Sequence, residues 1–140
     1  MRYRFNPKRR IRPWAAGDEE KLNNLADHAT YSGHPSHKRN PGDFGLSPPS
    51  QARLGKSLCD DVGIFRREEA LELLQRGLRL GLISLLEIGG WPKQVWAVTP
   101  EGLPLEAQRE ADGVYHGYPL REIDPMHQEV LAAWKKACNR

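Results

Sequence analysis

Histidine and basic side chains gather between residues 31 and 44, on a backbone that glycine and proline bend. The segment reads Tyr-Ser-Gly-His-Pro-Ser-His-Lys-Arg-Asn-Pro-Gly-Asp-Phe and carries His34, His37, Lys38, Arg39 and Asp43. An imidazole titrates near neutral pH, and adjacent cations can hold a phosphate or stabilise charge in a transition state. These residue types therefore suit the cleavage of a phosphodiester bond. The alternative is a solvated polar loop whose histidines have no chemical role.

Another histidine lies in residues 114–120, which read Val-Tyr-His-Gly-Tyr-Pro-Leu and have the pattern of a strand. Successive side chains of a strand point to opposite faces, so His116 and Tyr118 share one face while Tyr115 and Gly117 share the other. Gly117 allows another group to approach closely. A strand histidine between aromatic residues is either a hydrogen-bonded packing residue or, with a second acid–base group nearby, a catalyst.

Cleavage of a phosphodiester needs an acid, a base and cations around one phosphate. We assign His116 and His37 as the acid–base pair and Tyr118 as an orienting or stacking group. The phosphate contacts are assigned to basic residues of the same glycine- and proline-rich stretch: Lys38, Arg39 and Arg53. This mechanism requires His37 or His34 to lie roughly 4–8 Å from His116, across an open cleft.

A metal site is the alternative use of these histidines. His34 and His37 are separated by two residues, and Cys59 could join them, because zinc accepts mixed sets of histidine and cysteine ligands. A lone H-x-x-H lacks the paired spacing that makes zinc motifs specific. We therefore expect no metal and no other cofactor, and keep a small zinc-binding protein as an alternative.

Helical periodicity predicts three helices, at about 18–30, 67–80 and 122–137. Asp18 is expected to cap the first helix, and the second is the most strongly patterned. Strand patterns separated by turn residues follow at 82–88, 94–99, 103–109 and 114–120. The sequence thus predicts an α+β fold in which a four-stranded antiparallel sheet at about 82–120 packs against the three helices. Residues 31–57 are expected to form a long ordered loop rich in proline and glycine.

Size and charge are those of one small basic domain. The 140 residues form a single expected domain, with residues 1–17 as a basic N-terminal arm or edge strand. Lys and Arg number 21 against 18 Asp and Glu, a net charge of +3, and the basic residues cluster in the first dozen positions and at 38–56. Such clusters attract nucleic acid, although a terminal basic run is also an ordinary solubilising tail. Only two cysteines and no long apolar run favour a cytoplasmic protein without a membrane anchor.

The order of elements resembles that of the small toxin ribonucleases grouped around barnase, colicin D and RelE. The resemblance lies in a helix at 67–80 followed by four antiparallel strands, with His116 and Tyr118 on the last strand. It is one of layout, covers less than half of the chain, and matches no motif residue by residue. It implies RNA cleavage without a metal, in which a base deprotonates the 2′-hydroxyl, an acid protonates the leaving oxygen and cations hold the phosphate.

The sequence therefore predicts a small, basic, metal-independent endoribonuclease. RNA is the expected partner, together with a cognate inhibitor protein. The rival hypothesis is a non-enzymatic module that binds nucleic acid or an acidic protein, with the histidines in structural roles.

Overall fold

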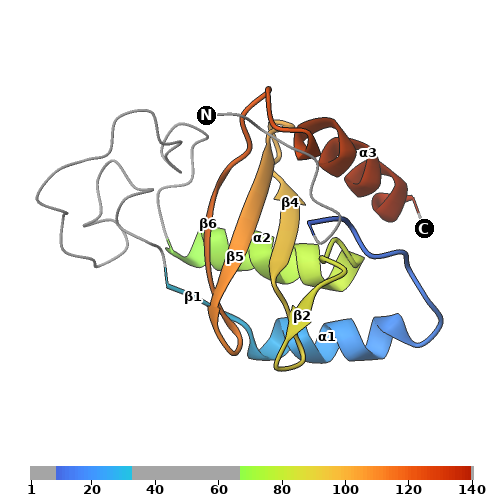
Figure 1. Cartoon of the computed structure of the whole chain (residues 1–140), viewed down its shortest axis with the longest axis vertical. Coiled ribbons are helices and arrows are strands. Elements are labelled where there is room, and N and C mark those ends of the chain that lie inside the picture. The colour runs from blue at the N-terminus through green and yellow to red at the C-terminus, as the bar shows by residue number, and fades with distance from the viewer. Residues whose placement is uncertain (1–8, 33–66, 140) are drawn as a thin grey trace, which may run out of the picture.

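The computed structural model describes residues 9–32 and 67–139. These ranges form an α+β fold, as the sequence predicts (Figure 1). In chain order the elements are α1 (Asp18–His28), β1 (Thr30–Tyr31), α2 (Arg67–Leu80), β2 (Glu87–Ile88), β3 (Trp91–Pro92), β4 (Gln94–Val98), β5 (Pro104–Ala111), β6 (Val114–Pro119) and α3 (Met126–Cys138).

The main sheet is mixed, and the prediction of a purely antiparallel sheet is wrong in this detail. Strands β4, β5 and β6 form the expected antiparallel meander, but the fourth strand is β1, which pairs in parallel with β6. The run predicted as a strand at 82–88 is divided. Ile83 makes an isolated bridge to Val95, whereas β2 pairs with β3 in a separate hairpin. The turn of that hairpin is Gly89-Gly90, whose positive φ angles of 61° and 82° suit glycine.

Helices α1 and α2 lie on one side of the sheet, with α2 crossing behind the strands in the view of Figure 1. The core there joins Leu22 of α1 to the leucines of α2 and to Val95 and Tyr115 of the sheet. Helix α2 approaches closely because Gly77 has no side chain, and a Cβ atom there would lie 2.3 Å from the carbonyl oxygen of Trp96. Leu74 is only 3% exposed, as expected for the face of α2 that meets the sheet.

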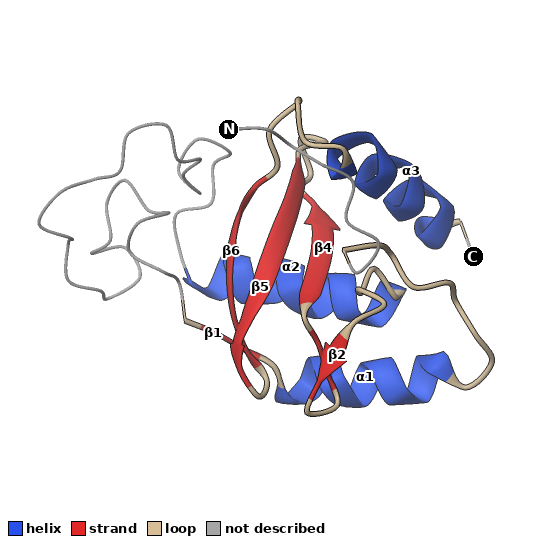
Figure 2. Ribbon diagram, viewed as in Figure 1, coloured by secondary structure: helices blue, strands red, loops and turns tan. Residues whose placement is uncertain are grey.

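Helix α3 lies beside β4 (Figure 2) and packs against the side of this strand that carries Trp96 and Val98. A second apolar cluster joins its Met126 and Val130 to Trp96 and Val98 of the sheet. The helix begins at Met126 and not at about 122, because the Asp124 carboxylate accepts the Met126 backbone N–H at 2.9 Å and residues 122–125 form a turn. Among the described residues, no helix has the length and apolar content that crossing a membrane requires.

The N-terminal segment, defined here as residues 9–12, runs along the sheet beyond β4. Arg12 donates its backbone N–H to Ile83 at 2.7 Å, Leu85 donates to Arg10 at 2.9 Å, and Ile11 bridges Ser84 in antiparallel register. These residues therefore extend the sheet as a short edge. Residues 1–8 of the expected basic arm lie outside the described part of the chain.

The expected capping role of Asp18 is wrong, because Gly17 occupies the cap position and Asp18 is the first residue of α1. The buried Asp18 carboxylate instead accepts both terminal nitrogens of Arg12 at 2.8 Å and the backbone N–H of Ala15 at 2.7 Å. The hydrogen bond from Arg12 is the main reason that the pKa of Asp18 is lowered. Asp18 thus ties α1 to the N-terminal segment.

Leu74→Ala should lower the free energy of unfolding by about 2–5 kcal/mol, because it removes buried methyl groups and leaves a cavity between α2 and the sheet. Urea denaturation measures the change. Glu72→Ala is the matched control on an exposed position of the same helix, and we expect a change within about 0.5 kcal/mol. Equal effects of the two substitutions would contradict the packing of α2.

Asp18→Asn should make stability less sensitive to acid. A lowered pKa in the folded state means that Asp18 stabilises the protein above its unfolded pKa of about 4, and that this contribution is lost as pH falls through the folded pKa. Urea denaturation from pH 7 to pH 3 should show a shallower loss of stability in Asp18→Asn than in the wild type. Glu19→Gln, at the exposed neighbouring position, should keep the wild-type slope.

Candidate acid–base site

Polar side chains occupy one face of the meander, on the side where α3 packs. The register aligns two rows across β4, β5 and β6: Gln94, Gln108 and His116 in one, and Trp96, Glu106 and Tyr118 in the other. Side chains alternate along each strand, so the members of both rows point to the same side of the sheet. We call these residues the polar face. His116 and Tyr118 share it, as the sequence predicts, with ring centroids 6.5 Å apart.

Glu106 is the centre of this face and is only 1% exposed. Its Oε1 accepts Nε of Arg9 at 2.6 Å and the indole Nε1–H of Trp96 at 2.9 Å. Its Oε2 accepts the Tyr118 hydroxyl and the Gln108 amide, the latter at 3.3 Å. A buried carboxylate is tolerated only when donors replace its hydration, and here both oxygens have two.

Arg9 supplies the positive charge for Glu106 and for a second carboxylate. Its terminal nitrogens donate to the two oxygens of Asp124 at 2.9 and 2.8 Å, in the fork geometry that suits arginine. Burial lowers the pKa of Arg9, but the hydrogen bonds and charges of Asp124 and Glu106 outweigh this, so the pKa is raised overall. Arg9 therefore stays charged and is engaged within the protein.

Tyr118 is held as a neutral phenol. Its hydroxyl donates to Glu106 and accepts the Gln108 amide N–H at 3.0 Å. Burial raises the pKa of Tyr118, and the Glu106 charge and hydrogen bond raise it further. Because its proton is directed at Glu106, Tyr118 suits the predicted orienting or stacking role better than that of a base.

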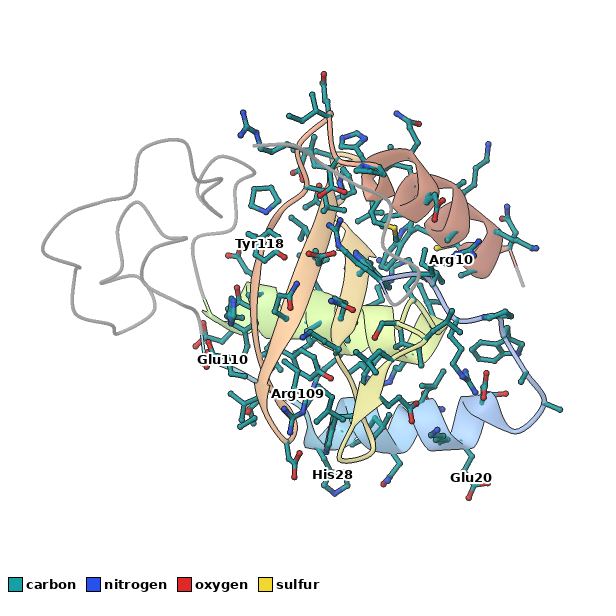
Figure 3. All side chains as sticks on the ribbon, in the orientation of Figure 1. Arg10, Glu20, His28, Arg109, Glu110 and Tyr118 are labelled. Carbon is teal, nitrogen blue, oxygen red and sulfur yellow. The ribbon has the colours of Figure 1, made fainter. Side chains whose placement is uncertain are left out.

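His116 lies beside another carboxylate, that of Glu110, on the β5–β6 side of the polar face. Its Nδ1 lies 2.7 Å from Oε1 of Glu110, which is an ion-pair distance, but the geometry is not that of a hydrogen bond. The β5–β6 register shifts between Arg109 and Ala111, which takes Glu110 out of the regular ladder. The two side chains are 19% and 33% exposed, so this pair is more accessible than Glu106. Figure 3 shows Glu110 and Tyr118 along the β5–β6 side of the sheet, with Glu20 and His28 on α1.

The structure brings together only part of the predicted site. His116 and Tyr118 are described, whereas the other predicted acid–base, phosphate-binding and zinc-binding residues lie outside the described ranges: His34, His37, Lys38, Arg39, Arg53 and Cys59. Their convergence with His116 therefore stays a prediction. Within residues 9–32 and 67–139, no group of three or more His, Cys, Asp and Glu side chains could hold a metal ion.

The sequence reasoning missed Glu106, Gln108, Glu110 and Arg9. The alternation of Leu105-Glu-Ala-Gln is a usable signal for Glu106 and Gln108, because it sends both to the face opposite the leucine. No local signal reveals Arg9, which looks like one more cation of a basic arm. Nor does any pattern in the sequence reveal the register shift that frees Glu110 from the ladder.

Comparison of the chain with protein-family models, with curated proteins and with solved structures finds no match. Function therefore has to be inferred from the geometry of the polar face and from the chemistry of its residues.

Tyr118→Phe should reduce the loss of stability at alkaline pH. A pKa raised in the folded state means that Tyr118 contributes stability below its unfolded pKa of about 10, and that this contribution is lost as pH rises above it. Urea denaturation between pH 9 and 11 measures how fast the free energy of unfolding falls with pH. In Tyr118→Phe this fall should be smaller than in the wild type by up to about 1.4 kcal/mol per pH unit. Identical slopes would show that Tyr118 is not held in its neutral form.

Proposed function

We propose that the protein is a metal-independent endoribonuclease in which His116, oriented by Glu110, is one member of the acid–base pair. The observation that carries the proposal is the 2.7 Å contact between Glu110 and Nδ1 of His116 on an accessible part of the polar face. A carboxylate beside one ring nitrogen of a histidine can orient the other nitrogen for proton transfer. Tyr118 lies beside this ring in an orienting or stacking role.

The reaction needs a second acid–base group, for which the proposal keeps His37. A base takes the proton of the ribose 2′-hydroxyl, the 2′-oxygen attacks phosphorus, and the bond from phosphorus to the 5′-oxygen breaks. The acid then gives its proton to that leaving oxygen, so the proton count balances. Ser32, the last residue of the first described range, lies beside the strand that carries His116, because it donates its backbone N–H to the carbonyl oxygen of Tyr115 at 2.8 Å. This supports a common site for His116 and the histidines that follow Ser32 in the sequence.

The charges of the described residues bear on phosphate binding. Arg9 is engaged by Glu106 and Asp124, and Arg109 by Asp112 at 2.5 Å. Acidic residues outnumber basic ones in the described ranges although the whole chain has a net charge of +3. The proposal therefore assigns the phosphate contacts to Lys38, Arg39 and Arg53. RNA, a cognate inhibitor protein and a cytoplasmic location belong to the same proposal.

The second candidate is a non-enzymatic binding module, and the internal pairing of the polar face favours it. Glu106, Tyr118 and Arg9 satisfy one another, which is also what a purely structural network does. In that case His116 and Glu110 form a structural pair. A binding module would act on nucleic acid or on an acidic protein through basic residues elsewhere in the chain.

Cleavage of a mixed-sequence RNA by the full chain in EDTA tests the proposal. His116→Ala should lower the rate by about 10²- to 10⁴-fold, the usual contribution of a general acid or base. Glu110→Gln should cause a smaller loss, because it removes the charge and keeps the shape. The matched control is His127→Ala, which removes a half-buried histidine of α3 and should leave the rate unchanged.

The other outcomes separate the alternatives. RNA binding that weakens with salt, without cleavage in EDTA or in added metal, would support the binding module. Cleavage that requires a metal, or one equivalent of zinc in elemental analysis, would support the zinc-binding alternative.

A further inference from the structure

Arg9 belongs to the N-terminal segment, yet its side chain reaches the centre of the polar face. One guanidinium joins Glu106 of β5 and Asp124 of the turn before α3, which are 97 and 115 positions away in the sequence. The side chains of both carboxylates are nearly inaccessible, at 1% and 7% exposure. A cation that served only solubility would stay exposed to water and would not lie between two buried carboxylates.

The position of the Glu106 carboxylate depends on this cation. If Arg9 is removed, Glu106 keeps neutral donors from Trp96, Gln108 and Tyr118 but loses the cation that offsets its burial, which favours rotation of the carboxylate or its movement toward water. Each response changes the position of Oε2, the oxygen that accepts the Tyr118 hydroxyl. A change at Arg9 is therefore transmitted to the Tyr118 ring beside His116.

We infer that Arg9 is a positioning residue of the proposed ribonuclease site, which holds Glu106 and, through Glu106, the Tyr118 ring beside His116. The effect on activity rests on the proposed function, whereas the chain of contacts from Arg9 to Tyr118 does not. Arg9 then forms part of the site and is not merely a residue at the edge of the sheet.

The test compares Arg9→Met with Arg12→Met in the full chain. Arg12 is the matched control because it lies on the same segment and forms its own two-pronged ion pair, with Asp18 of α1 and not with the polar face. Arg9→Met should lower kcat by about tenfold or more with KM within about twofold, because it displaces a group beside the reacting atoms. Arg12→Met should lower the melting temperature but keep kcat within about twofold.

A double-mutant cycle shows whether Arg9 acts through Tyr118. In the Tyr118→Phe background, Arg9→Met should have little further effect on kcat, whereas independent effects would multiply and overturn the inference.

Arg9→Lys replaces Arg9→Met in these measurements if Arg9→Met does not fold. Its compact ammonium keeps the charge but cannot reproduce the fork on Asp124 together with the contact to Glu106. Wild-type kcat in Arg9→Lys would overturn the inference, and a partial loss supports it.

The indole N–H of Trp96 gives a readout that does not need activity, because it donates to the same Glu106 oxygen as Arg9. Its NMR resonance is identified as the indole N–H signal that is lost in Trp96→Phe. Arg9→Met should shift this resonance and Arg12→Met should not, and an unchanged resonance in Arg9→Met overturns the inference.

The two proposals fail in distinguishable ways. If the wild type cleaves no RNA, the proposed function fails, and the Trp96 resonance alone decides whether Arg9 positions Glu106. If the wild type cleaves RNA and the two arginine variants have equal kcat, the proposed function stands and the positioning role is overturned.

Discussion

The burial of one carboxyl side chain, that of Glu106, constrains much of the structure. An unpaired charge inside a protein is very costly, so Glu106 must be surrounded by donors wherever the fold places it. These donors come from β4, β5, β6 and the N-terminal segment. A shift of β5 by one residue would turn Glu106 toward α2 and the apolar core, so its charge helps to fix the register of the meander.

The elements that the sequence predicts well are those with a local pattern. The leucines of α2 recur at helical spacing and its bounds match the prediction, and the meander follows from alternating runs separated by turn residues. Alternation also places His116 and Tyr118 on one face correctly, because the period of a strand requires no knowledge of the rest of the fold.

The features that sequence reasoning missed depend on contacts between distant residues. Strand β1 is only two residues long and is a strand because it pairs with β6, more than eighty positions later. The role of Arg9 depends on two carboxylates that the chain brings to it only after folding. Glu110, which contacts His116, lies where the β5–β6 register shifts, and the alternation of residue types gives no sign of that shift.

Gly77 places α2 almost against the carbonyl oxygen of Trp96, and the indole of the same tryptophan contacts Glu106 on the other side of the sheet. The packing on the two sides of the sheet is therefore coupled through one residue, Trp96. Any side chain at position 77 would push β4 away from the helix and carry the indole with it. Natural variants of this chain should therefore keep glycine at position 77, although other residues are intrinsically more favourable in a helix.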